Sequence, residues 1–188
     1  MPQENCKDEM EEIEKRGYNL TEHLGKGAFG DVWRVQKTDG SAFAIKRIRC
    51  IPKEMRRILR ELGILRRLKD CGHPGVIRIH EAWLGTMRWT NQMLFMVLDD
   101  GGVSLSCYLY KKEMRNPKDP LPNRDAANKI AHQLTKQLCT GVAFLHSVSV
   151  IHRDLKPGNV VVSLFARLGC QQCHRTCVVT DPHVYRAR

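Results

Sequence analysis

The sequence lacks a long apolar segment and an apolar, basic leader. No run of residues approaches the ~20 consecutive apolar residues that a membrane-spanning helix needs. The chain opens with Met1-Pro2-Gln3-Glu4 and continues as an acidic stretch, whereas signal and transit peptides carry basic residues at this place. Eight cysteines without such a leader are most simply reduced thiols. We therefore expect a protein of the cytoplasm or the nucleus that does not bind a membrane.

Basic residues outnumber acidic residues in the chain as a whole, but not in its first residues. The 188 residues carry a net charge of +11, although residues 1–14 hold six acidic residues and one lysine. We interpret residues 1–17 as an acidic polar leader that precedes one domain, residues 18–188. No nucleic-acid recognition motif accompanies the basic charge, so we expect no nucleic-acid partner.

After the leader, the sequence changes between patterns typical of β-strands and patterns typical of α-helices. Short β-rich runs from Tyr18 to about Ile48 predict an antiparallel meander, because their connections are too short for a crossover helix. Residues 53–69 predict a helix with one apolar stripe and a basic opposite face. The stripe consists of Met55, Ile58, Leu59, Leu62, Leu65 and Leu68. One hypothesis is that the acidic leader folds onto this basic face; unchanged activity after deletion of residues 1–17 would count against it.

Further strands are predicted at 76–83 and 93–98, and Asp99–Gly102 then breaks the pattern as a hinge. Beyond the hinge we expect a short helix at about 104–112, a polar insert at 116–124 and a long helix at 125–146. The buried face of the long helix is predicted from its apolar spacing: Ile130, Leu134, Leu138, Val142 and Leu145.

The first chemical motif is a glycine-rich loop, Gly25-Lys26-Gly27-Ala28-Phe29-Gly30-Asp31-Val32. Glycines let a backbone approach phosphate groups closely and turn without a Cβ clash. A dinucleotide-binding loop shares this spacing, but its last glycine opens a helix. Here the β-rich Val32–Val35 follows, which favours a strand–loop–strand arrangement over the dinucleotide alternative.

A lysine and a glutamate form the second candidate pair. Lys46 directly follows the apolar run Phe43–Ile45. Most lysines in strands simply extend into solvent. Glu61 falls among the apolar residues of the predicted 53–69 helix, and a carboxylate there is costly unless it is paired. We therefore predict that Glu61 pairs with Lys46, which then presents a fixed cation to phosphate.

The third motif is Ile151-His152-Arg153-Asp154-Leu155-Lys156-Pro157-Gly158-Asn159. Phosphoryl transfer needs a carboxylate at the acceptor hydroxyl, a cation near the transferred phosphate and metal ligands. Asp154, Lys156 and Asn159 offer all three within six residues. A solvated turn is the alternative interpretation of the same stretch.

These motifs, in this order, resemble the eukaryotic protein kinase family, from about Tyr18 to at least Val162. The resemblance implies an α+β, two-lobed fold: an N-lobe at 18–100 with an antiparallel sheet plus one helix, and a mainly helical, truncated C-lobe at 101–188. It also implies ATP and Mg²⁺ as cofactors and transfer of the γ-phosphate to protein hydroxyls. Asp-Leu-Lys-Pro at 154–157 resembles the serine/threonine branch.

The resemblance also assigns roles. Lys46 would bind the α- and β-phosphates with Glu61 as its anchor, Asp154 would be the catalytic base with Lys156 beside it, and Asn159 would ligate magnesium. Leu98 would gate the back of the adenine pocket, with Asp99–Gly101 as the hinge. Nucleotide contacts would come from the glycine-rich loop and its flank: Leu24, Gly25, Lys26, Gly27, Ala28, Phe29, Gly30 and Val32.

The chain departs from the family pattern after Val162. There is no Asp-Phe-Gly, which supplies the family's second metal ligand, and the nearest candidate is Asp181-Pro182-His183. A nucleotide- or protein-binding module without catalysis, pseudokinase-like or truncated, is therefore the alternative function. The cysteines and histidine at 170, 173, 174 and 177 have zinc-type side chains, but their crowding favours free thiols.

Overall fold

The structure, a computed structural model, describes residues 3–27, 30–86, 92–110, 124–162, 176–178 and 185–186. These residues form two compact units, one from residues 1–69 and 78–100 and the other from residues 70–77 and 101–188. None of the described helices is both long and apolar enough to span a membrane.

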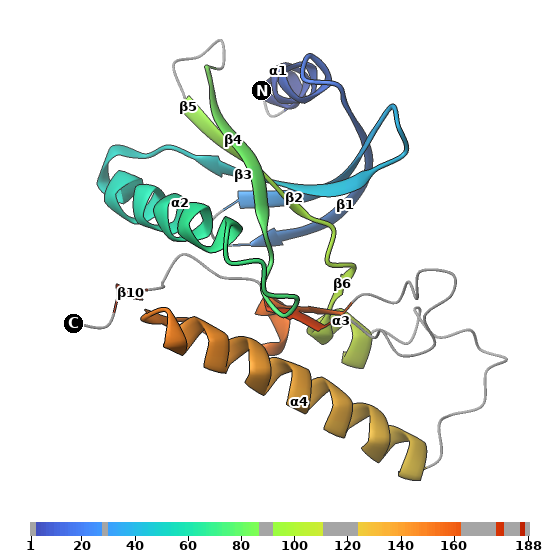
Figure 1. Cartoon of the computed structure of the whole chain (residues 1–188). Helices are drawn as coiled ribbons and strands as arrows, with labels where there is room; N and C mark the ends of the chain where they lie inside the picture. Colours follow the sequence, from blue (N-terminus) through green and yellow to red (C-terminus); the bar gives the residue numbers. More distant parts are fainter. Residues whose placement is uncertain are drawn as a thin grey trace, which may run out of the picture. The chain divides into compact units, whose positions relative to one another are not determined.

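The first unit is built on a five-stranded antiparallel sheet, as the sequence predicts. The strand order is β1-β2-β3-β5-β4, and every neighbouring pair is antiparallel (Figure 1). The strands are β1 (Tyr18–Gly27), β2 (Gly30–Lys37), β3 (Ala42–Arg49), β4 (Ile79–Thr86) and β5 (Gln92–Asp99).

Both faces of this sheet are covered. Successive side chains of a strand point to opposite faces, so Lys46 and Ile48 of β3 share one face while Ile45 and Arg47 share the other. The inner strand β5 is buried continuously from Met93 to Leu98. A strand that is buried on both faces requires a packing partner on each side of the sheet.

The Lys46 face is covered by α2 (Met55–Lys69), which follows a 3₁₀ turn, η1 (Pro52–Glu54). Its buried residues are Ile58, Glu61, Leu62, Ile64, Leu65 and Leu68. Leu59 is 58% exposed, so its place in the predicted stripe is wrong. The buried face lies on the Glu61 and Ile64 side of the helix, away from Leu59.

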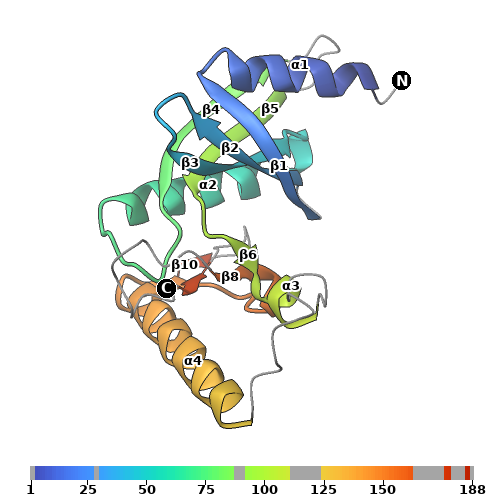
Figure 2. The same ribbon diagram turned by 90° about the vertical axis from the view of Figure 1, so that its right-hand side faces the viewer.

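The opposite face is covered by α1 (Gln3–Glu14), a segment that is predicted from the sequence only as a polar leader. Ile13 of α1 is 1% exposed and joins a buried cluster on this face. The cluster contains Tyr18, Val35, Ile45, Trp83, Met93, Phe95 and Val97. The helix ends at Glu14, and the turn after it closes at Gly17, whose N–H donates to the Glu14 carbonyl and whose φ of 77° suits a glycine. Thus α1 covers the sheet instead of the basic face of α2 (Figure 2).

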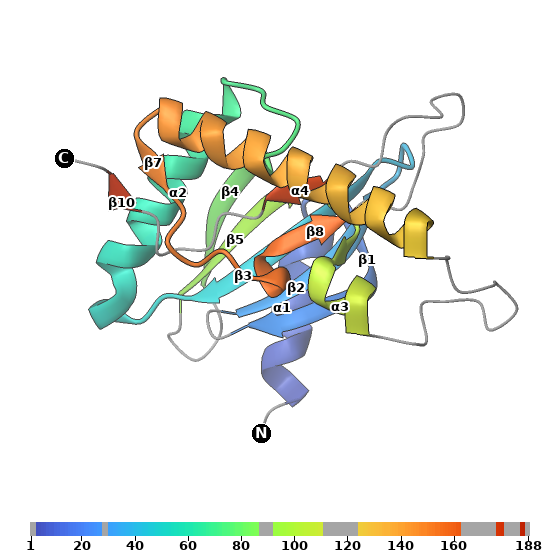
Figure 3. The same cartoon turned by 90° about the horizontal axis from the view of Figure 1, so that it is seen from below.

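In the second unit, the described residues form two small sheets and two helices (Figure 3). In one sheet β8 (Val160–Val162) lies between β6 (Val103–Ser104) and β9 (Thr176–Val178) and pairs with both. In the other, β7 (Val150–Ile151) pairs with β10 (Tyr185–Arg186). Its helices are α3 (Leu105–Tyr110) and α4 (Arg124–Ser147), and a 3₁₀ turn, η3 (Pro157–Asn159), precedes β8.

The long helix α4 is less buried than its sequence predicts. Leu145 is fully buried, whereas the other four residues of the predicted face are only half-buried. Among the described elements, α4 contacts β7 and β9. The predicted polar insert lies outside the described residues, except for Arg124, which begins α4.

Packing of α1 can be tested with one substitution. Ile13→Ala removes a buried side chain from the cluster, so we expect the free energy of unfolding to fall by about 2–4 kcal/mol. The matched control is Glu14→Ala, an exposed position of the same helix, with an expected change within about 0.5 kcal/mol. Urea denaturation of the full chain measures both. Equal stability of the two variants would mean that α1 is not packed on the sheet.

Candidate active site

The glycine-rich motif forms the hairpin between β1 and β2. Gly27 lies opposite Gly30 in the register, and the two residues between them, Ala28 and Phe29, lie outside the described residues. Gly30 has φ of 142°, and a Cβ there would overlap the carbonyl oxygen of Arg47 on β3. The close approach of β2 to β3 therefore requires a glycine at position 30, whether or not a ligand binds the hairpin.

An apolar surface lies on the same sheet face as Lys46. Val32 is the register partner of Lys46, and Ala44 is the register partner of Leu98. Ala44 and Leu98 are buried, and Leu24 of β1 is half-buried. Small and branched apolar groups beside a lysine match a ligand with a flat apolar part and an anionic part.

The predicted pairing of Lys46 with Glu61 is present. Lys46 Nζ donates to Glu61 Oε1 at 2.8 Å, and the two side chains are 12% and 3% exposed. The partners belong to β3 and α2, so the ion pair joins the sheet to its helix. A lysine held in this way keeps its charge at one place on the sheet face.

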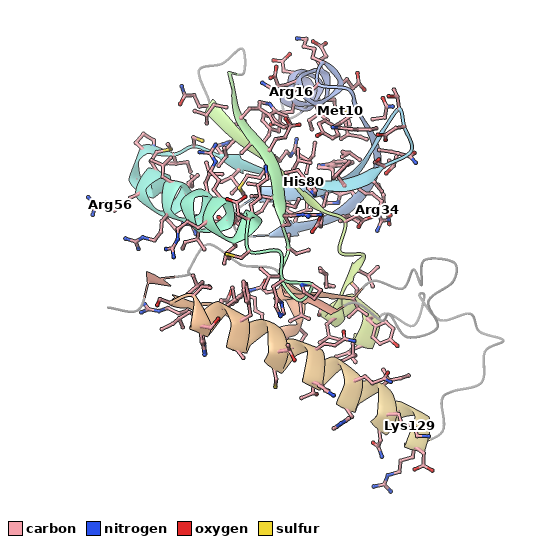
Figure 4. The ribbon with its side chains drawn as sticks, viewed as in Figure 1. Met10, Arg16, Arg34, Arg56, His80 and Lys129 are labelled. Atoms are coloured by element: carbon pink, nitrogen blue, oxygen red, sulfur yellow. The ribbon has the colours of Figure 1, made fainter. Side chains whose placement is uncertain are left out.

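The end of β5 is fixed by an interaction that sequence reasoning missed. His80 of β4 lies 2.7 Å from Asp99 Oδ1 through its Nε2, and the backbone N–H of Arg78 donates to Asp99 Oδ2 at 3.2 Å. Partial burial acts to raise the pKa of Asp99, but these hydrogen bonds and the nearby charges of His80 and Arg78 lower it overall. The pairing depends on the β4–β5 register, which the sequence does not show. His80 lies within the first unit (Figure 4), and its backbone carbonyl accepts from Lys69 Nζ, at the end of α2, at 3.1 Å.

In the second unit, the catalytic-loop motif forms a connected polar cluster. Lys156 Nζ donates to Asp154 Oδ2 at 2.7 Å, and Asn159 Nδ2 donates to the same oxygen at 2.9 Å and to the Asp154 carbonyl at 2.7 Å. The three predicted residues are therefore brought together, and the carboxylate is held in one orientation. Lys156 is 56% exposed, so solvent screens its ion pair with Asp154 and the pair is weak.

The backbone of this loop is held by buried neighbours. His152 is fully buried, and its Nδ1 accepts from the Asp154 N–H at 3.3 Å. Arg153 adopts φ of 63°, an uncommon conformation for a residue other than glycine. Such conformations persist where the surrounding structure imposes them, as at many functional sites.

Candidate metal ligands are only partly within the described residues. Asn159 uses its amide nitrogen toward Asp154, so the amide oxygen is the atom with which it can ligate a cation. Asp181 and the zinc-type residues Cys170, Cys173 and His174 lie outside the described residues, and only the backbone of Cys177 is described, in β9. The described part of the chain holds no group of three acidic, histidine or cysteine side chains arranged for a metal.

Removal of one partner of the buried ion pair should be costly. Glu61→Ala leaves the Lys46 ammonium mostly buried without its partner, so we expect the free energy of unfolding to fall by about 3–5 kcal/mol. The double variant Lys46→Met/Glu61→Leu should recover most of this loss, because two apolar groups replace the pair. Urea denaturation gives both values. An equal loss in the single and double variants would contradict the assignment of the cost to an unpaired charge.

The depressed pKa of Asp99 predicts a pH-dependent stability. A carboxylate whose folded pKa is lowered stabilises the fold above its unfolded pKa of about 3.9, and the contribution is lost as the pH falls through the folded value. Since the side chain is 36% exposed, solvent screening limits the effect of Asp99→Asn to about 1 kcal/mol at pH 7. Urea unfolding between pH 7 and pH 2 should show this deficit shrinking with acidity. A deficit that is constant with pH would contradict the prediction.

Comparison with known proteins gives one consistent family. The family model described as the protein kinase domain matches residues 18–168. The chain is 30% identical over 161 residues to the serine/threonine-protein kinase ksp1 of Schizosaccharomyces pombe, covering 82% of this chain and 31% of the relative. It is 30% identical over 150 residues to cyclin-dependent kinase B2-1 of Oryza sativa subsp. japonica, covering 77% and 43%.

A third relative is the interferon-induced, double-stranded RNA-activated protein kinase of Rattus norvegicus, 31% identical over 157 residues, with 74% of this chain and 27% of the relative covered. The chain thus spans less than half the length of these curated relatives. The match to the family model covers most of the chain and includes the glycine-rich hairpin, the Lys46–Glu61 pair and the Asp154–Asn159 loop. The chain belongs to the eukaryotic protein kinase family.

Proposed function

We propose that the protein transfers the γ-phosphate of ATP to serine or threonine hydroxyls of a protein substrate. The observation that carries the proposal is the cluster of Asp154, Lys156 and Asn159, in which two donors converge on one carboxylate oxygen. A carboxylate, a cation and an amide oxygen are the groups that phosphoryl transfer requires. The three relatives described above, all protein kinases, support the reaction class.

In this proposal the first unit binds the nucleotide. Lys46, held by Glu61, pairs with the α- and β-phosphates. The glycine-rich hairpin supplies backbone N–H groups to the phosphates, and Leu24, Val32 and Leu98 contact the adenine. Asp99–Gly101 forms the hinge that follows the adenine-binding strand. The division into lobes at 18–100 and 101–188 is likewise proposed.

The second unit supplies the groups that act on the transferred phosphate. Asp154 orients the acceptor hydroxyl and takes its proton as the hydroxyl oxygen forms its bond to the γ-phosphorus and the bond to the β-phosphate oxygen breaks. Lys156 releases Asp154 and neutralises charge on the transferred group. The buried His152 keeps the loop backbone in place throughout.

Magnesium fits this site only in part. Asn159 offers one neutral oxygen, whereas magnesium in such sites is held by one or two carboxylates together with substrate phosphates. Asp181 is the proposed source of the further carboxylate, with proline and histidine in place of the family's phenylalanine and glycine. When bound, magnesium neutralises phosphate charge and orients the leaving group.

One observation favours a second function, a binding module without catalysis. The chain has no Asp-Phe-Gly, and a kinase without its second metal ligand could retain nucleotide or protein binding through Lys46 and the hairpin alone. The two functions differ in one property. Only the enzyme moves phosphate to a protein, whereas both can bind ATP.

Phosphate transfer separates these functions. We expect the full chain to transfer labelled γ-phosphate from Mg-ATP to a generic basic protein, and Asp154→Asn to lower the rate by about 10²-fold or more because the base is lost. Asp125→Asn, an exposed aspartate in the first turn of α4, is the matched control and should leave the rate unchanged.

Binding of Mg-ATP by isothermal titration calorimetry completes the experiment. Binding without transfer, in folded protein, would establish the binding module and contradict the enzyme. A folded chain that neither binds nor transfers would contradict both functions.

A further inference from the structure

The helix α1 carries a buried acid that faces the sheet. Glu9 is 8% exposed, and its carboxylate pairs with the guanidinium of Arg47 on β3. Ile13, one turn later, is buried in the cluster on the same face. Arg16, just beyond the helix, places its guanidinium carbon 4.4 Å from the centre of the Trp83 ring (Figure 4). An acid, an apolar residue and a cation thus fix this segment to the sheet at successive points.

Arg47 extends the pairing to β2. Its Nη2 donates to Asp31 Oδ2 at 2.8 Å, and Asp31 is its register partner across the two strands. The side chains of Arg47 and Asp31 are both largely buried. His23 of β1 lies 3.6 Å from the other carboxylate oxygen of Asp31. The charges form a chain from Glu9 through Arg47 to Asp31, and therefore from α1 to the sheet.

This chain ends at the base of the glycine-rich hairpin. Asp31 directly follows Gly30, and Arg47 directly follows Lys46. Gly30 also lies so close to the Arg47 backbone that no Cβ fits between them. Arg47 therefore restrains the start of β2 twice, through its main chain at Gly30 and through its side chain at Asp31. A group that holds Arg47 restrains the hairpin as well.

We propose that Glu9 is a positioning residue for the glycine-rich hairpin. By holding Arg47, Glu9 keeps Asp31 and the start of β2 in the arrangement that binds the triphosphate of a nucleotide. The helix α1 lies outside the matched kinase region, residues 18–168, so this support is an addition to the family domain. The part of the proposal that concerns nucleotide rests on the proposed function; the part that concerns the hairpin does not.

Hydrogen–deuterium exchange of the full chain tests the hairpin directly. Glu9→Gln removes the charge while keeping the shape, so amide exchange in β2 near Gly30 should become about threefold to tenfold faster. Exchange in α2, on the other face of the sheet, should stay unchanged. Glu14→Gln changes the same charge at an exposed position of α1 and should alter neither. Should Glu9→Gln fail to fold, Glu9→Asp should show the same change with a smaller size.

A uniform acceleration over both β2 and α2 would overturn the proposal, because it would mark Glu9 as a general stabiliser. Unchanged exchange in β2 would overturn it as well. The second measurement is the Kd for Mg-ATP by calorimetry, which Glu9→Gln should raise by about threefold to tenfold. An unchanged Kd with faster exchange would overturn the link to nucleotide. Absence of ATP binding in the unsubstituted chain would instead contradict the proposed function, and exchange would still decide the role of Glu9.

Discussion

The first unit depends on two buried ion pairs made by adjacent residues of β3. Lys46 and Arg47 point to opposite faces of the sheet, and each meets a buried glutamate, Glu61 of α2 and Glu9 of α1. Because a strand alternates its side chains, one strand can in this way hold a helix on each side of the sheet. The central strands are then buried on both faces. Lys46 is also the residue proposed to bind the phosphates, and Arg47 lies against Gly30 of the glycine-rich hairpin. The residues that pack the helices on the sheet are therefore also the ones that position the proposed nucleotide site.

The sequence is informative where a residue conflicts with its surroundings. Glu61 sits among leucines on an amphipathic helix, and the cost of a buried, unpaired carboxylate is enough to predict its pairing with Lys46. The antiparallel meander of β1, β2 and β3 follows equally well from β-rich runs with short connections. The functional residues of the catalytic loop lie within a few consecutive positions. The local backbone therefore brings them together, and the motif alone is enough to predict that they are neighbours.

Sequence reasoning failed where the partner is distant and the local signal is weak. The segment at 3–14 has few apolar residues, and Glu9 is one acid among several, so nothing local distinguishes it as buried. The continuous apolar run Met93–Leu98 does indicate a strand that is covered on both faces. This run predicts that a second element packs on the sheet opposite α2. The His80–Asp99 pairing had no such signal, because it follows from the register of two strands. Leu59 was misplaced because apolar character alone does not fix which side of a helix is buried.

The most direct test is an experimental structure of the full chain with magnesium and a non-hydrolysable ATP analogue. The account predicts that Lys46 Nζ contacts both Glu61 and a phosphate oxygen, while Arg47 remains paired with Glu9 and Asp31. The glycine-rich hairpin should then lie over the phosphates. An analogue bound away from Lys46, or a nucleotide-bound chain in which α1 has left the sheet, would contradict it.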